Sequence, residues 1–303
     1  MPDTDSLILP LAEVPATADW LLQQPMPVIA VGAGAVANAD VVVDSARAAQ
    51  ALAANIARQP AAALALVQVL RAVERLPLEL ALNVESLAYA TLQGGAGHRA
   101  WLQARQAPPA PVAGGDGAAV QLSREGDVIY ARLNRPRERN SMTVEMRDAL
   151  VELLELVILD TSITRVELSA AGACFSVGGE LREFGLATDT AEAHRIRSLC
   201  LPGRLLARCA DRVHCFVHSA CLGSGAEFPA FAGRVTAHPK SFFQLPELEL
   251  GLIPGAGGCV SISRRIGRQR TAWMVLSGKR VTAATALGWG LVDAVAESVD
   301  LPV

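Results

Sequence analysis

The sequence has 303 residues, of which 51% are hydrophobic and only 4% aromatic, and its formal net charge is −3. A chain of this length and hydrophobicity buries a large core, in one domain or two, which excludes a disordered adaptor. Few aromatic residues and no basic excess also exclude a stacking platform or a basic surface for nucleic acid, whereas local basic clusters could still hold a small phosphorylated ligand.

The N-terminal segment begins acidic and lacks the basic start and apolar run of a signal peptide. No stretch reaches the roughly 18 uninterrupted apolar residues of a membrane span. The six cysteines are scattered through the chain, unlike the dense pattern of a secreted disulfide framework. We therefore expect a protein of the reducing cytoplasm that does not bind a membrane.

Four parts follow one another along the chain. "MPVIAV" and "ADVVVD" predict two short strands around a glycine turn, and the next segment has apolar residues at helical spacing, which Pro60 and Pro77 divide into about three helices. A Pro/Gly-rich stretch then predicts a linker. The predicted parts are 1–44 (strands), 45–107 (helices), 108–118 (linker) and 119–303 (core).

The core alternates strands and helices. Its predicted elements are a hairpin around Gly126 and Asp127, a helix from Thr143 to Val157 capped by Thr143, a strand at "TRVELSA", a helix from Ala191 to Cys209, a strand from Arg212 to Ser219, and a short helix from Ala226 to Ala232 with Pro229 in its first turn. This alternation predicts an α/β fold.

Two motifs invite a function and are set aside. Gly32, Gly34 and Ala37 form a GxGxxA pattern, but the next strand follows within three residues, which leaves no room for the helix of a dinucleotide site. A cysteine- and histidine-rich stretch has no tetrahedral zinc spacing, and alternate residues of a strand point to opposite faces. Its members are Cys209, His214, Cys215, His218 and Cys221. We predict an ordinary turn and core residues, with no metal.

Small residues stand beside two glutamates, Glu227 and Glu247. Ser224 precedes the first of them but lacks a nucleophile-elbow pattern, which argues against a serine hydrolase. "FSVGGE" and "LGSGAE" both leave backbone N–H groups open, and two such donors aimed at one carbonyl oxygen would form an oxyanion hole. The alternative is that the glutamates only cap helices or pair with arginines.

Five motifs from Val120 to Ala294 resemble the crotonase, or enoyl-CoA hydratase/isomerase, superfamily, in the family's order and spacing. They are "ARLNRPRERNSMTVEMRDAL", "ACFSVGGELREF", "HSACLGSGAEF", "QLPELELGLIPGAGG" and "LSGKRVTAATALGWGLVDAV". The resemblance implies a spiral of ββα units, an acyl-CoA substrate with no permanently bound cofactor, a role in fatty acid metabolism, and a homotrimer or homohexamer.

Carried over residue by residue, the resemblance implies acid/base carboxylates at Glu227 and Glu247 and oxyanion-hole N–H groups from Gly179 and Ser224. It also suggests coenzyme A contacts from Arg139, Val177, Leu181 and Arg182, although both arginines could equally be solvated surface charges. The presence of both glutamates favours hydration of an enoyl-CoA, a lyase reaction. The alternatives are a double-bond isomerase or other enolate chemistry that uses Glu247 alone, and a catalytically weak homologue that serves as a binding or assembly partner.

The sequence departs from the family pattern in two ways. Ser224 stands where glycine is usual, and its hydroxyl could narrow the acyl pocket or hold a water. The segment 45–107 resembles the helical tail that family members carry after the core, whereas here the sequence stops shortly after the last core motif. We therefore expect a circular permutation, the alternative being an unrelated N-terminal helical domain on a truncated core.

Overall fold

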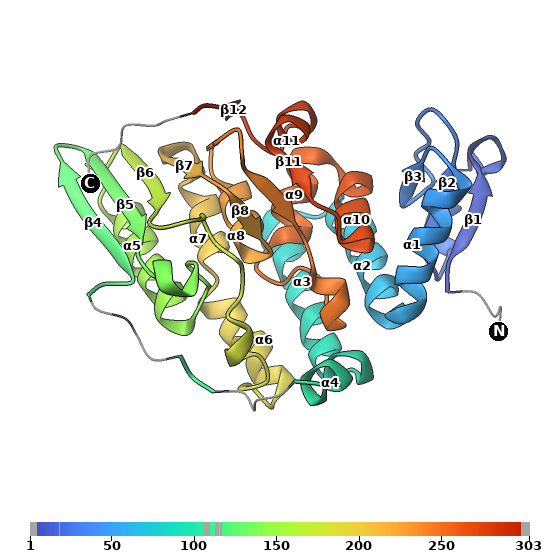
Figure 1. Ribbon diagram of the computed structural model, residues 1–303, viewed down its shortest axis with the longest axis horizontal. Coiled ribbons are helices and arrows are strands. Elements are labelled where there is room, and N and C mark those ends of the chain that lie inside the picture. The colour runs from blue at the N-terminus through green and yellow to red at the C-terminus, as the bar shows by residue number, and fades with distance from the viewer. Residues whose placement is uncertain (1–4, 18, 106–109, 113–114, 116, 298–303) are drawn as a thin grey trace.

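The computed structural model describes residues 5–17, 19–105, 110–112, 115 and 117–297 (Figure 1). Its largest sheet has six strands in the order β12–β9–β7–β6–β5–β4, and only the β4–β5 pair is antiparallel. These strands are β4 (Val120–Glu125), β5 (Val128–Leu133), β6 (Arg165–Ala170), β7 (Val213–Val217), β9 (Arg234–Ala237) and β12 (Ala294–Val295). The alternation of helices and strands confirms the predicted α/β class.

A smaller sheet has the order β11–β10–β8. Its strands are β8 (Ala220–Leu222), β10 (Phe242–Gln244) and β11 (Val281–Thr282). Although β7 is followed almost at once by β8, the two strands belong to different sheets, and β9 and β10 divide in the same way. Ser176, in the segment after β6, extends this pattern through a bridge to Cys221. Successive stretches of chain therefore contribute to both sheets, which brings the segments after Ser176 and after β8 together.

Helices pack against these sheets (Figure 1). The α-helices are α1 (Ala46–Arg58), α2 (Pro60–Val73), α3 (Leu78–Gln93), α4 (Ala96–Gln103), α5 (Val144–Leu159), α6 (Thr190–Leu199), α7 (Pro202–Arg208), α8 (Ser224–Glu227), α9 (Gly258–Ile266), α10 (Arg268–Ser277) and α11 (Ala283–Trp289). The 3-10 helices are η1 (Leu11–Glu13), η2 (Leu21–Gln23), η3 (Pro136–Glu138), η4 (Leu181–Glu183), η5 (Ala210–Arg212), η6 (Pro229–Phe231) and η7 (Glu247–Leu250).

The first elements of the core form as predicted. Strands β4 and β5 pair around the turn at Gly126 and Asp127. Helix α5 begins after Thr143, whose side-chain oxygen accepts a hydrogen bond from the Met146 N–H at 3.1 Å. That bond satisfies one of the N–H groups that a helix start leaves without a partner.

Two predicted helices are divided differently in the structure. The segment 191–209 forms α6 and α7, because Leu201 takes an extended conformation before Pro202, as residues before proline do. The predicted helix Ala226–Ala232 instead begins at Ser224 as α8, and Pro229 opens a separate 3-10 turn, η6. The earlier start places Ser224 in the first turn of α8.

The N-terminal helical segment contains four helices rather than three. Pro60 begins α2 and Pro77 precedes α3 as predicted, but the pair Gly94–Gly95 ends α3, and α4 follows it. Glycine has a high cost inside a helix, which explains the additional break. Helix α3 packs between α2 and α6 and also contacts α9, so the segment lies against the core rather than apart from it (Figure 1).

A third sheet, β1–β2–β3, lies at one end of the molecule (Figure 1). Its parallel strands are β1 (Leu7–Pro10), β2 (Val28–Val31) and β3 (Val41–Val43), of which the sequence predicted the last two. Neighbouring residues of β2 serve two cores, since Ile29 belongs to the main core and Val28 to a small one of this region. This alternation is the two-residue period of a strand.

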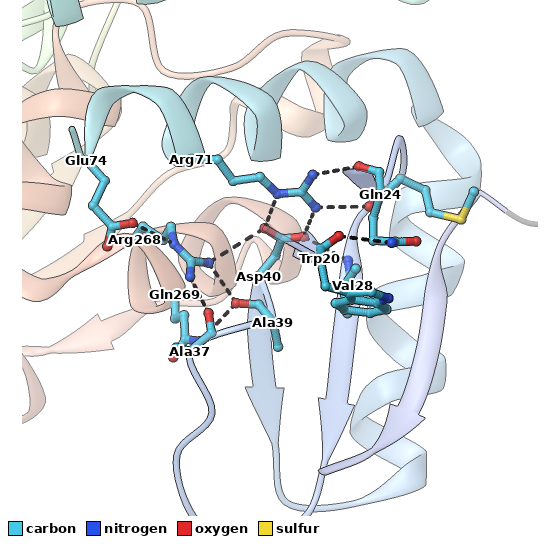
Figure 2. Close-up of polar contacts among 11 residues, drawn as sticks. Trp20, Gln24, Val28, Ala37, Ala39, Asp40, Arg71, Glu74, Arg268 and Gln269 are labelled. Atoms are coloured by element: carbon cyan, nitrogen blue, oxygen red, sulfur yellow. Dashed lines mark hydrogen bonds and ion pairs between the residues drawn. The ribbon is translucent and has the colours of Figure 1, made fainter. Parts of the chain in front are cut away.

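A buried charge cluster joins this sheet to the helices (Figure 2). Asp40, only 2% exposed, binds the Arg71 guanidinium of α2 through both carboxylate oxygens, at 2.9 and 2.5 Å. It also accepts the Val28 N–H at 2.8 Å and lies 3.7 Å from Arg268 of α10. Arg268 in turn binds Glu74 and two backbone carbonyls. Paired buried charges therefore hold this sheet against helices α2 and α10.

Part of the predicted linker 108–118 lies outside the described residues. Of the described part, the Ala110 N–H donates to the Arg182 carbonyl at 2.9 Å, and the Val112 N–H donates to the Glu183 carboxylate at 3.4 Å. The described part of the linker therefore lies alongside η4. No single described helix is long and apolar enough to span a membrane, and only α1 and α2 taken together, bent by 110°, meet that test.

Candidate active site

Glu227 ends the short helix α8 and is only 2% exposed. Its Oε2 atom accepts hydrogen bonds from the Ala256 and Gly258 N–H groups, both at 2.8 Å, at the start of α9. A Cβ atom at position 258 would lie 2.4 Å from Glu227 Cγ, so only glycine allows this approach. The second oxygen, Oε1, has no hydrogen-bond partner within the described part of the chain and stays available for another group.

Glu247 opens η7 directly after Pro246 and is 8% exposed. A Cβ atom on Gly223 would lie 2.6 Å from Glu247 Oε1, and Gly223 has a positive φ of 48°. Glycine is therefore required at 223 for two reasons. Oε2 of Glu247 is buried and has no hydrogen-bond partner among the residues that the structure describes. The two predicted carboxylates thus lie against opposite ends of the turn 223–227.

Burial changes the protonation of both carboxyl groups. It raises the pKa of Glu227 to about 7, although the Ala256 and Gly258 N–H groups act in the opposite direction. Burial, and next the charge of Glu227, raise the pKa of Glu247 well above its ordinary value. Charged carboxylates in a dry site repel each other, so one of them holds a proton near neutral pH. Glu247 Oε2, without a partner, is the natural place for that proton.

A third acid, Glu85 of α3, joins this pair, and the sequence interpretation missed it. Glu85 is 1% exposed and accepts the Gly257 and Cys259 N–H groups at 2.7 and 2.8 Å. Burial and then the charge of Glu227 raise the pKa of Glu85. One signal was present in the sequence: Glu85 falls on the apolar face of α3, between Leu82 and Tyr89, where a charge is unusual.

Tyr89 stands one helical turn after Glu85. A Cβ atom on Gly255 would lie 2.2 Å from the Tyr89 ring, so the ring packs directly on the loop before α9. The Arg197 guanidinium of α6 lies 4.4 Å from the ring centroid. Burial raises the pKa of Tyr89, and its hydroxyl therefore stays neutral.

The predicted oxyanion-hole donors lie on two paired segments. Hydrogen bonds from the Leu222 N–H to the Ser176 carbonyl, at 3.0 Å, and from the Ser176 N–H to the Ala220 carbonyl, at 3.2 Å, hold these segments together. The N–H groups of Gly178, Glu180 and Gly223 are used internally, but those of Gly179 and Ser224 have no acceptor among the described residues. Such open donors, side by side on a rigid frame, are what a developing oxyanion needs.

The Ser224 hydroxyl is also buried without a hydrogen-bond partner in the described part of the chain, and the residue is 6% exposed. A buried hydroxyl without a partner costs about 1–3 kcal/mol. Ser224 Oγ and Glu247 Oε2 are both such atoms, and the residues that carry them adjoin Gly223: Ser224 follows it in the chain, and the other Glu247 oxygen, Oε1, packs against it. Their position beside the open N–H groups marks this region as one that a polar ligand would complete.

The residues predicted to contact coenzyme A gather along one edge. The Val177 N–H donates to the Arg139 carbonyl at 3.2 Å, and Leu181, which is 48% exposed, lies on η4 with Arg182. Arg182 is not a solitary cation, because its guanidinium binds both oxygens of Glu180, at 2.8 and 2.9 Å. This ion pair lowers the pKa of Glu180 to about 2. A phosphate would have to share Arg182 with that carboxylate.

The glycine pattern at 32–37 and the cysteine- and histidine-rich stretch form ordinary parts of the fold. Residues 33–40, after Gly32, form a loop rather than a helix, and His214 binds Thr236 at 2.8 Å. Among the described residues no group of three or more His, Cys, Asp or Glu side chains could hold a metal ion. A cavity of about 840 Å³ lies over the six-stranded sheet, beside Tyr130 and Glu167, and includes none of the predicted site residues.

More than half of the chain matches a known protein family. Residues 123–302, more than half of the chain, match the model of the enoyl-CoA hydratase/isomerase family. The 2,3-dehydroadipyl-CoA hydratase of Escherichia coli K12 is 34% identical over 172 residues, which are 57% of this chain and 67% of that protein. The chain spans about two thirds of the length of the curated relatives it matches.

Solved structures give the same result. An enoyl-CoA hydratase of Mycobacterium smegmatis superposes with a TM-score of 0.55 at 27% identity, over 59% of this chain and 70% of the other. The enoyl-CoA hydratase of Thermoplasma volcanium superposes with a TM-score of 0.54 at 25% identity, over 60% and 73%. The chain therefore belongs to the crotonase, or enoyl-CoA hydratase/isomerase, superfamily.

Proposed function

We propose that this protein adds water to the double bond of an α,β-unsaturated acyl-CoA thioester. One observation carries the proposal: two buried glutamates with raised pKa values, Glu227 and Glu247, lie beside two open backbone N–H groups, those of Gly179 and Ser224. Carboxyl groups with raised pKa values suit proton transfer, and open amides suit a developing oxyanion.

The steps follow from the roles of these groups. The Gly179 and Ser224 N–H groups receive the thioester oxygen and stabilise the enolate, and one such donor contributes about 3 kcal/mol to lowering the barrier. Glu227, held through Oε2, accepts a proton from water at Oε1 while the water oxygen attacks the β-carbon. Glu247 donates a proton to the α-carbon. Glu227 ends α8, and Glu247 packs against Gly223 directly before α8, so both carboxylates border the same short helix. This supports addition to a single face of the double bond, a syn hydration.

Coenzyme A would follow the edge formed by Arg139, Val177, Leu181 and Arg182. Arginine suits phosphate oxygens because of its fixed fork of donors. We propose that Arg139 makes the stronger contact, since the Arg182 guanidinium already binds Glu180. The likeness to a 2,3-dehydroadipyl-CoA hydratase makes that thioester the first substrate to test, followed by short, long, branched and aromatic enoyl-CoA esters.

Glutamine substitutions test the proposal. In Glu227→Gln and Glu247→Gln, hydration should fall by about 10²- to 10⁴-fold, the usual contribution of a positioned acid or base. Glu249→Gln serves as the matched control, because Glu249 is exposed in the same 3-10 turn. Isomerisation that survives Glu227→Gln would favour the isomerase that uses Glu247 alone. Stabilisation by CoA esters without turnover of any of them would favour a binding or assembly partner.

We also propose the family's spiral of ββα units for residues 119–303 and a circular permutation for residues 45–107. Their packing supports this: α3 contacts α9 and brings Glu85 to the site, as an integral part of the core would. An experimental structure superposed on a solved relative tests the permutation. Helix α3 should overlay a helix that follows the core in the relative's sequence. If no helix of the relative overlays α3, the permutation is contradicted.

We propose a homotrimer or homohexamer, and sedimentation equilibrium tests this oligomeric state.

A further inference from the structure

The start of α9 presents four consecutive backbone N–H groups to two different carboxylates. The N–H groups of Ala256 and Gly258 donate to Glu227, and those of Gly257 and Cys259 donate to Glu85, at distances of 2.7 to 2.8 Å. The two acids therefore alternate along one stretch of backbone. A helix start leaves its first N–H groups without internal acceptors, and its positive dipole end favours negative charge.

Because the four amides are consecutive, their directions are coupled. A change in the peptide planes at Gly257 and Cys259 would also turn those at Ala256 and Gly258, since each plane shares its Cα atoms with its neighbours. Glu85 uses one oxygen for each of its amides, whereas Glu227 uses Oε2 for both. Glu85 thus fixes the backbone, and the backbone fixes which oxygen of Glu227 stays open.

We propose that Glu85, from the N-terminal helical segment, is a positioning residue for the base Glu227 and acts through the shared amides of residues 256–259. This inference rests on the proposed hydration, in which Glu227 activates water. Glu85 need not contact the substrate, because its two oxygens are occupied by Gly257 and Cys259. Its effect is on the direction and the charge of Glu227.

Glu85 also affects the charge of Glu227, because the two buried carboxyl groups lie close enough to interact. The charge of Glu227 raises the pKa of Glu85. Because the repulsion between two charges is reciprocal, an ionised Glu85 acts on Glu227 in the same direction, and interacting buried groups titrate as a pair rather than singly. The other titratable or charged groups that face Glu85 are Glu247 of η7, Tyr89 of its own helix, Arg197 of α6 and Cys259 of α9. Only Arg197 is a cation, and it favours the charged form of Glu85. With its two amides and Arg197, Glu85 is the better placed of the pair to hold the negative charge.

The variant Glu85→Gln tests this role. A glutamine offers one acceptor and one donor, so one of the amides of Gly257 and Cys259 would face another donor. We expect kcat to fall about 10- to 100-fold, as for small displacements of a catalytic group, with little change in KM. We also expect the titration of Glu227 to move about one pH unit lower or more, because the neighbouring negative charge is gone.

Carbon-13 NMR of labelled glutamate carboxyl groups, with Glu227→Gln for assignment, measures this titration without substrate. Glu79→Gln is the matched control, since Glu79 lies on the same helix, exposed, and pairs with Arg204. Glu85→Asp keeps the charge and should restore the wild-type titration. An unmoved Glu227 titration in folded Glu85→Gln protein would overturn the inference. If that titration moves but the wild-type chain hydrates no enoyl-CoA, the proposed function fails and the coupling of the two acids stands.

Discussion

Two clusters of buried acids in this molecule are built in opposite ways. At the N-terminal sheet, Asp40 binds Arg71 through both oxygens, has Arg268 within 3.7 Å, and accepts a backbone N–H (Figure 2). At the active site, Glu85 and Glu227 accept only backbone amides, and no ion pair with an arginine, lysine or histidine is formed by either of them or by Glu247 within the described part of the chain.

The difference separates an acid that holds structure from acids that hold protons. A carboxylate paired with two guanidinium groups fixes the elements that carry those groups. For carboxyl groups surrounded by amides and apolar side chains, burial raises the pKa, to about 7 in the case of Glu227. Both clusters are buried, so it is the presence of a counter-charge, and not burial, that decides which role an acid takes.

The largest stability effect should come from the paired cluster. In Asp40→Asn, Arg71 and Arg268 lose their buried counter-charge, and the free energy of unfolding should fall by about 3–5 kcal/mol. Asp44→Asn, an exposed position in the same region, is the control and should change stability by less than about 0.5 kcal/mol. Urea unfolding measures both. If Asp40→Asn and Asp44→Asn had equal free energies of unfolding, the buried ion pairs of Asp40 would not be what holds this part of the structure.

The pH dependence of the free energy of unfolding tests the active-site acids. Because the pKa of Glu227 is raised from 4.5 to about 7, the folded state binds a proton that the unfolded state releases. The resulting stability, about 3 kcal/mol, is fully present below pH 4.5 and is lost as the pH rises to about 7. Over the same window kcat should rise, since only ionised Glu227 accepts a proton. Unfolding at several pH values, with Glu227→Gln lacking most of this change, checks the assignment.

The smallest effect concerns Ser224. Ser224→Ala removes a buried hydroxyl without a partner and should stabilise the free protein by about 1 kcal/mol. The backbone N–H stays, so hydration of the best substrate should change by less than about tenfold. A loss near that of Glu247→Gln would instead assign the hydroxyl a direct part in the reaction. Thermal unfolding and steady-state kinetics of the same preparation give both values.

The sequence predicted the local parts of the site better than its assembly. Glu227, Glu247 and their glycines lie in short motifs, and α5 with its Thr143 cap follows from a local pattern. The interpretation missed Glu85, because its place on the apolar face of a helix was the one local signal, and nothing near it in the sequence shows that the amides at 257 and 259 donate to it. The third break in the N-terminal helical segment, at Gly94–Gly95, had a local signal. The pairing of Arg182 with Glu180, in contrast, depends on a turn that the pattern did not specify.

The bonds from Glu85 to the start of α9 also affect how the protein is made. Glu85 and Gly257 are 172 residues apart, and Cys259 is two residues further on. At 5–20 residues per second, a ribosome needs about 10–30 s to synthesise this interval. During that time α3 exists without the backbone that its acid binds and without the α9 face that covers Leu82 and its neighbours. The growing chain therefore carries exposed apolar helices and an unassembled site until α9 has been synthesised.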